Sequence, residues 1–218
     1  MASFGSQVST IGVATSTTMD PGTWVDQGST EVSSKAGSAY NAIDSNIVKV
    51  GSDFYMNFGS FWGDIYQVKM ESNLRKKSGS SYQIAWTSFG NGAMEGAFMY
   101  YRSGYYYLFT SWGNCCQLVP RPASVVLESH GYVYAPGHGG VIEVPNVGSV
   151  LYYHYGKTIT PSVTTFALSL IANANANESW IFLTNVLLFS VNNNQGTNQA
   201  ATYFGWNVIG WSGGWPTV

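Results

Sequence analysis

The sequence contains little charge of either sign. Charged residues make up 9% of its 218 residues, and 9 lysines and arginines stand against 11 aspartates and glutamates. The one basic run, Arg75-Lys76-Lys77, is too short to form an extended phosphate-binding surface. Nucleic-acid binding is therefore not expected, because it requires a concentrated basic patch.

Cysteines and long apolar runs are also scarce. Cys115 and Cys116 are neighbours, so they cannot form the long-loop disulfide that stabilises many secreted domains. The most apolar regions, 166–172 and 180–191, each fall short of the roughly 20 residues that span a bilayer, so no membrane segment is expected. The opening Met-Ala-Ser-Phe-Gly-Ser has neither a basic nor an apolar stretch and predicts no signal peptide.

Aromatic residues and glycine are what the sequence has in abundance. Aromatics make up 16% of the chain, and there are 25 glycines. This composition favours short strands joined by tight turns over surface helices, which are built from glutamate and lysine. The prediction is an all-β protein.

One segment of the sequence recurs at a fixed spacing. The stretch that begins at Asp44 matches, without a gap, a stretch that begins 51 positions later at Glu95. Each copy has a carboxylate, a short apolar strand, a turn of glycine and serine, and a second strand rich in aromatics. Repeats of about this period are typical of propellers and other repeat folds.

A third, looser copy begins at His138, with a histidine where the other two copies have an acid. Asp44, Glu95 and His138 therefore occupy equivalent points of three units. In a propeller, equivalent ends of the innermost strands surround one mouth of the central channel, so these side chains are expected to converge on a site. The alternative is that they are turn residues of a shared shape.

The rest of the chain completes one predicted domain. Residues 157–200 contain asparagine-rich tracts with no counterpart in the other units, and we interpret them as an atypical insertion. The prediction is a single domain over residues 1–218. The other expected strands are residues 8–14, 22–26, 65–70 and 203–208.

Six motifs follow one another in a specific order. They are Tyr40-Asn41-Ala42-Ile43-Asp44, Gly59-Ser60-Phe61-Trp62, Met94-Glu95-Gly96-Ala97-Phe98, Cys115-Cys116, Tyr134-Ala135-Pro136-Gly137-His138-Gly139-Gly140 and Leu151-Tyr152-Tyr153-His154-Tyr155. Together they resemble the endo-1,5-α-L-arabinanases of glycoside hydrolase family 43, the fungal members especially. The resemblance covers most of residues 1–155 and 203–218.

The resemblance implies a five-bladed β-propeller that cleaves α-1,5-linked arabinan with inversion. Glu95 matches the general acid, and Asp44 matches the carboxylate that raises the pKa of the acid and orients it. Such an effect is physically sound, because a nearby like charge disfavours ionisation. The positions that match sugar-contacting residues of the family are Asn41, Ala42, Ile43, Gly59, Ser60, Phe61 and Trp62.

His138 matches a family histidine near the channel axis. The resemblance implies that it could help to hold a structural calcium or sodium ion through water, although hard cations prefer oxygen ligands. A buried, hydrogen-bonded histidine without a metal is the alternative. No cofactor is expected to be required for the chemistry.

An inverting glycosidase also needs a second carboxylate as general base. In the family this residue follows a histidine in a His-Asp-Pro motif, which this chain lacks. Asp20, in Met19-Asp20-Pro21-Gly22, is interpreted as a turn residue instead. The general base is therefore predicted to be absent. At the observed spacing at most four units fit, so we expect an incomplete propeller of about three to four blades, with impaired turnover.

Two functions follow from these observations. The first is arabinanase-type hydrolysis of arabinan, a polysaccharide of pectin side chains, by an extracellular monomer, as the resemblance implies. The second is a non-catalytic carbohydrate-binding propeller fragment, whose aromatic side chains hold the sugar chain without cutting it.

Overall fold

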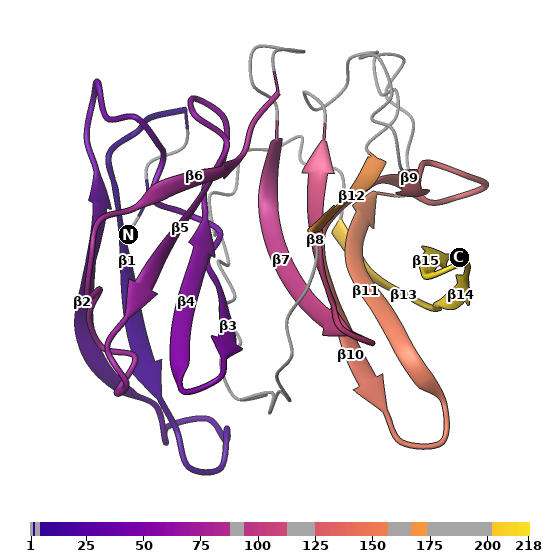
Figure 1. The fold of residues 1–218 in the computed structure, drawn as a ribbon, viewed down its shortest axis with the longest axis horizontal. Helices are drawn as coiled ribbons and strands as arrows, with labels where there is room; N and C mark the ends of the chain where they lie inside the picture. The colour runs from indigo at the N-terminus through magenta and orange to yellow at the C-terminus, as the bar shows by residue number, and fades with distance from the viewer. Residues whose placement is uncertain (1, 3–4, 88–93, 113–124, 157–166, 174–201) are drawn as a thin grey trace.

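The computed structural model describes residues 2, 5–87, 94–112, 125–156, 167–173 and 202–218. Within these ranges the chain forms strands and turns and no helix, which confirms the predicted all-β class. The strands make five antiparallel sheets, which follow one another across the molecule in nearly the order of the sequence (Figure 1). The N-terminus and the C-terminus lie on opposite sides.

The first sheet is the hairpin of β1 (Ser9–Thr15) and β2 (Val25–Ser34). The prediction of a strand at 22–26 was wrong at its start, because the chain turns there. The Thr23 N–H donates to the Asp20 carbonyl at 3.2 Å, which closes a β-turn around Pro21 and Gly22. Asp20 is exposed in this turn, in accord with its interpretation as a turn residue.

The second sheet contains four consecutive antiparallel strands in the order β3-β4-β5-β6. They are β3 (Asn46–Val50), β4 (Asp53–Phe58), β5 (Ile65–Met70) and β6 (Tyr82–Ala85). The predicted third strand of this unit, at 65–70, is confirmed. A two-residue turn, Gly51-Ser52, joins the first two strands, as the repeat predicts.

The third sheet includes part of the predicted insertion. Its order is β7 (Met94–Arg102), β8 (Tyr105–Trp112), β12 (Ala167–Asn173) and β9 (Val125–Leu127). Ala167 pairs with Trp112 and Asn173 with Tyr106, so β12 pairs with residues 106–112 of β8. The described part of the insertion therefore supplies a sheet strand, and the rest of 157–200 lies outside the described residues.

The third copy of the repeat forms the fourth sheet. Its strands are β10 (Tyr134–Val144), β11 (Gly148–Gly156) and β13 (Thr202–Val208), and β13 confirms the strand predicted at 203–208. A short hairpin of β14 (Gly210–Ser212) and β15 (Trp215–Thr217) ends the chain. The pairs β3-β4, β7-β8 and β10-β11 are thus the three repeated units.

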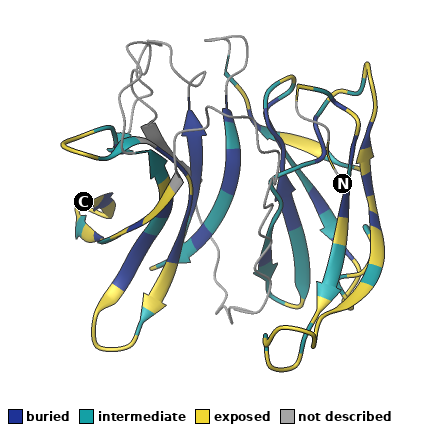
Figure 2. Ribbon diagram, turned by 180° about the vertical axis from the view of Figure 1, so that it is seen from behind, coloured by how far each residue is buried: buried dark blue, intermediate teal, exposed yellow. Residues whose placement is uncertain are grey.

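Three apolar clusters join the sheets to one another. Ile11 and Val32 of the first hairpin pack with Phe58 and Val68 of the second sheet. Ile65 and Ala85 pack with Leu108 and Trp112, and Tyr100 and Phe109 pack with Val141 and Leu151. Buried residues accordingly run along the middle of the strands, and exposed ones gather at the hairpin tips (Figure 2).

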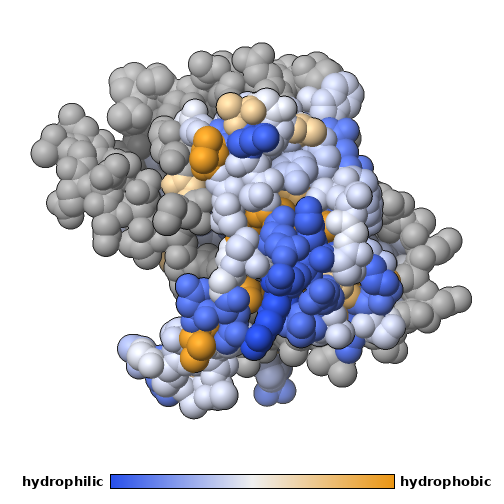
Figure 3. All heavy atoms as spheres, turned by 90° about the vertical axis from the view of Figure 1, so that its left-hand side faces the viewer, coloured by the Kyte–Doolittle hydropathy of each residue, from blue (hydrophilic) through white to orange (hydrophobic). Residues whose placement is uncertain are grey.

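The outer side of the molecule at β1 and β2 is largely hydrophilic (Figure 3). Serine and threonine dominate these two strands, and their buried positions alternate along β2 at Thr30, Val32 and Ser34. In the described part of the chain, no helix is long and apolar enough to cross a membrane.

Candidate active site

The structure brings the three equivalent residues of the repeat together. Asp44 lies two residues before β3, Glu95 is the second residue of β7, and His138 lies within β10. His138 Nδ1 is 3.8 Å from Asp44 Oδ1, and the Gly96 N–H donates to the Asp44 carboxylate. The convergence that the repeat predicts is therefore present in the fold.

Unusual backbone conformations place these side chains. Asp44, Gly96 and His138 all have positive φ, at 58°, 62° and 46°. The pairing register shifts between Glu95 and Phe98 and again between Gly137 and Gly140, which marks an irregularity of the bulge type in β7 and in β10. Bulges re-aim side chains and are common beside active sites.

Two serines at equivalent points of the repeat each hold the functional residue of the next unit. Ser60 Oγ donates to Glu95 Oε2 at 2.8 Å, and the His138 backbone N–H donates to Ser111 Oγ at 2.6 Å. Ser60 and Ser111 are 51 positions apart, the spacing of the repeat. The sequence contained this signal for Ser111, although its role depends on contact between units.

Burial controls the protonation of Glu95. Removal from water raises the pKa of its carboxyl group, and the neighbouring Asp44 charge raises it further. The hydrogen bond from Ser60 and the charge of His138 lower this pKa, but the net direction is upward. A carboxyl group in this state holds its proton closer to neutral pH, as a general acid requires.

Asp44 has a raised pKa for the same reason. Its side chain is 20% exposed, and desolvation raises the pKa, while the charge of His138 and the Gly96 N–H oppose the shift. His154, whose ring centroid lies 6.4 Å from that of His138, has a lowered pKa because of burial and the His138 charge. His154 therefore favours the neutral form. It belongs to the motif Leu151–Tyr155, but the sequence predicted no role for it.

The predicted sugar-contacting residues separate into two groups. Asn41 and Ala42 are buried, at 4% and 1% exposure, and the Asn41 Oδ1 accepts a hydrogen bond from Ser9 at 2.8 Å. They anchor the segment that leads to Asp44, next to the half-buried Ile43. Their contact with sugar stays a prediction, and the structure shows a packing role.

The second group lies on the turn of residues 59–64, directly beside Glu95. Ser60 forms an isolated antiparallel bridge with Glu95, and its side chain contacts the carboxylate. Gly59 has a φ of 130°, and a Cβ there would lie 1.9 Å from the Asp64 carbonyl oxygen. Phe61 is half-buried, and Trp62, two residues after Ser60, is 45% exposed.

The structural calcium or sodium ion near His138 stays a prediction. Within the described ranges, no group of three or more histidine, cysteine, aspartate or glutamate side chains is arranged to hold a metal ion. Calcium takes six to eight oxygen ligands, whereas one imidazole and one carboxylate face each other here.

A second catalytic carboxylate does not emerge from the described residues. Asp44 is the one carboxylate there whose charge acts on the pKa of Glu95. Asp20 lies exposed in the β1-β2 turn, and Glu178 lies outside the described residues. The arrangement can supply a proton donor, Glu95, and a residue that raises its pKa, Asp44. The absence of a general base stays a prediction.

Comparison with known proteins gives one consistent result. The sequence profile of the glycosyl hydrolases family 43 matches residues 1–169. The whole chain is 40% identical to the probable arabinan endo-1,5-alpha-L-arabinosidase A of Aspergillus terreus, and spans 64% of the length of that relative.

Solved structures resemble the fold in the same way. An endo-arabinanase of family 43 from Bacillus licheniformis superposes with a TM-score of 0.64 and 26% identity, over 99% of this chain and 70% of that one. An arabinanase from Bacillus subtilis gives a TM-score of 0.66 at 24% identity, over 99% of this chain and 69% of that one.

Proposed function

The chain belongs to glycosyl hydrolase family 43, and on that premise we propose that it is a glycosidase of the arabinanase type. The substrate in this proposal is α-1,5-linked L-arabinan, which is cleaved internally with inversion. The observation that carries the proposal is the Glu95 carboxyl group, which is held by Ser60, faces Asp44 and His138, and has a raised pKa.

Each residue has a distinct part in the proposed reaction. Glu95 gives its proton to the leaving glycosidic oxygen, because a protonated carboxyl group is required for that step. Burial raises the pKa of Glu95, and the charge of Asp44 raises it further; Asp44 is itself held by Gly96 and His138. Trp62 and Phe61 supply flat apolar faces for a furanose ring.

Turnover by this chain is proposed to be impaired. Inversion requires a general base about 6.5 to 9.5 Å from the acid, with room for a water molecule. The sheets are interpreted as successive blades of an incomplete five-bladed propeller, about three to four in number. This interpretation is supported by the two-stranded first sheet and by the span of 64% of the Aspergillus terreus relative. The proposal places the protein outside the cell as a monomer, where the polymer is found.

The test is the release of reducing sugar from debranched arabinan by the full chain. Glu95→Ala is expected to abolish any activity, whereas the matched control Glu71→Gln, on an exposed turn, is expected to retain it. Activity that survives Glu95→Ala would remove Glu95 from its role. Strong activity that depends on Glu95 would show that a base is present.

A second candidate is a carbohydrate-binding fragment without turnover. It is favoured by the combination of an exposed Trp62 and a single carboxylate neighbour of Glu95 within the described residues. Retardation of the chain in arabinan affinity gels, with no sugar release under the same conditions, would support this candidate. Sugar release without retardation would argue against it.

A further inference from the structure

The carboxylate of Asp64 is fully buried and binds two backbone N–H groups. Its side chain is 0% exposed; Oδ2 accepts from the Thr87 N–H at 2.8 Å, and Oδ1 accepts from the Met94 N–H at 3.3 Å. Met94 directly precedes Glu95, and Thr87 is the last described residue before Met94. One side chain therefore binds both Thr87 and Met94, the first residue of β7.

Other residues of the turn 59–64, to which Asp64 belongs, also bind Met94 and Glu95. The Phe61 N–H donates to the Met94 carbonyl at 3.1 Å, and the Asp64 N–H donates to the Phe61 carbonyl at 2.8 Å. Ser60 Oγ completes the contact through its bond to Glu95 Oε2. Met94 is thus bound at both its N–H and its carbonyl group, directly next to the proposed acid.

This turn has a backbone that is costly to maintain. Phe61, Trp62 and Asp64 have φ values of 53°, 51° and 58°, in the left-handed region that residues other than glycine avoid. Such residues cost on the order of 1–3 kcal/mol each and persist where surrounding contacts determine them. The two bonds to the Asp64 carboxylate are among the contacts that do so.

Asp64 carries out this role without a cationic partner. The described residues include no ion pair to its carboxylate. Burial raises the pKa of Asp64, and the bonds from Thr87 and Met94 oppose that rise. Loss of the carboxylate would remove the acceptor of the part-buried Thr87 N–H and of the buried Met94 N–H, at a cost of about 1–3 kcal/mol for the buried donor.

We propose that Asp64 is a positioning residue of the candidate site, which holds the Glu95 carboxyl group in place through the backbone of Met94. The inference rests on the proposed function only in that Glu95 is the acid. Misplacement of a reacting group by about 1 Å can reduce the rate a hundredfold, so a buried acceptor that binds the backbone of the residue next to Glu95 can control the position of the acid.

The test compares Asp64→Asn with the matched control Glu71→Gln. Asparagine keeps the size of the side chain, but its amide group has one acceptor oxygen and presents N–H groups to one of the two backbone donors. In the full chain, the side-chain carboxyl 13C resonance of Glu95 is followed from about pH 4 to pH 8. Asp44 and His138 face Glu95 and are assigned in the same spectra.

The expected result is that Asp64→Asn shifts this resonance and lowers the Glu95 pKa toward that of an exposed carboxyl group, whereas Glu71→Gln changes neither. Where arabinan hydrolysis is measurable, kcat is expected to fall at least tenfold, with KM changed less than about threefold. A lower melting temperature with an unchanged Glu95 resonance and kcat would overturn the proposal and leave Asp64 a purely structural residue.

A measurement on the unmodified chain decides the matter if Asp64→Asn does not fold. Protonation of Asp64 should move the Met94 and Thr87 amide resonances together, and the Glu95 carboxyl resonance should respond at the same pH. A Glu95 resonance that ignores this transition would also overturn the proposal. If the Glu95 shifts are found but arabinan is not cut, the proposed function fails and the positioning role stands.

Discussion

His138 Nδ1 lies 3.8 Å from Asp44 Oδ1, although His138 lies in β10 and Asp44 lies just before β3, a strand of a different sheet. The positive charge of a protonated His138 lowers the pKa values of both Asp44 and Glu95, and the charge of Asp44 raises that of Glu95. The protonation of the proposed acid therefore depends on two side chains that reach it from other units of the repeat.

Substitution Asp44→Asn is expected to make the proposed acid stronger. It removes the like charge that raises the pKa of Glu95, so the pKa falls and a smaller fraction of Glu95 is protonated at neutral pH. The basic limb of any pH–rate profile should move to lower pH. A profile that keeps its basic limb in place would show that Asp44 does not act on Glu95 through its charge.

The same substitution is expected to raise stability near neutral pH. The pKa of Asp44 is higher in the folded than in the unfolded chain, because burial disfavours the carboxylate. The buried Asp44 carboxylate therefore lowers the free energy of unfolding at pH values above the pKa of Asp44 in the folded chain. This destabilisation is lost as the pH falls to the pKa of Asp44 in the unfolded chain, about 4. Melting temperatures of Asp44→Asn and the parent should therefore differ near pH 7 and converge in acid.

Substitution Gly96→Ala is expected to disturb the site and the fold together. Gly96 has a φ of 62°, and a Cβ would lie 3.2 Å from both His138 Cα and Ser111 Oγ. The backbone strain and the close contact together should lower the free energy of unfolding by about 2 kcal/mol or more, as measured by urea unfolding. Gly104→Ala is the control, since it has a φ of 88° with nothing within 4 Å, and should cost only about 1 kcal/mol.

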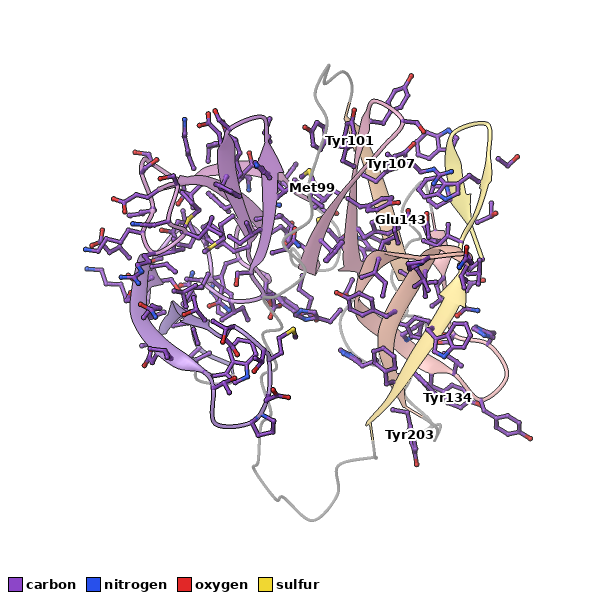
Figure 4. All side chains as sticks on the ribbon, turned by 90° about the horizontal axis from the view of Figure 1, so that it is seen from below. Met99, Tyr101, Tyr107, Tyr134, Glu143 and Tyr203 are labelled. Carbon is purple, nitrogen blue, oxygen red and sulfur yellow. The ribbon has the colours of Figure 1, made fainter. Side chains whose placement is uncertain are left out.

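Substitution Ser149→Ala is expected to loosen the C-terminal hairpin. Ser149 Oγ donates to Glu143 Oε1 at 2.6 Å and accepts from Trp211 Nε1 at 3.3 Å, while the Arg102 guanidinium lies 4.5 Å from the Trp211 ring. Figure 4 shows Glu143 in the half of the molecule that carries this hairpin. The loss of buried bonds should cost about 1–3 kcal/mol and change the tryptophan fluorescence.

The control for that prediction is Ser33→Ala, on an exposed position of β2. It should alter the free energy of unfolding by less than about 0.5 kcal/mol. Equal effects of the two substitutions would contradict a specific role for Ser149.

Substitution Trp62→Ala is expected to weaken the binding of arabino-oligosaccharides without unfolding the chain. Trp62 is 45% exposed in the turn that also contains Ser60, so its removal should take away an exposed aromatic face at little cost in packing. A loss of about 1 kcal/mol, or roughly fivefold in Kd, is expected by calorimetry. Trp24→Ala, at 37% exposure on the first hairpin, should leave Kd unchanged.

Local pattern and the repeat account for much of the fold. Alternating apolar residues and glycine turns predicted the strands at 65–70 and 203–208 and the three repeated hairpins, because strand periodicity and turn preference act over a few residues. The strand at 22–26 was misplaced because a turn and the strand that follows it share polar residues. β12 could not be expected, since its partner β8 lies far away in the sequence.

The sequence by itself determined the all-β class, the spacing that sets Asp44, Glu95 and His138 at equivalent points, and the serines that follow the same spacing. Only the tertiary structure decided how these residues meet. Ser60 reaches Glu95, Ser111 binds His138, and the buried Asp64 holds the residue next to Glu95. The physical reason is that desolvation and hydrogen bonds between sheets depend on long-range packing, which local sequence patterns do not encode.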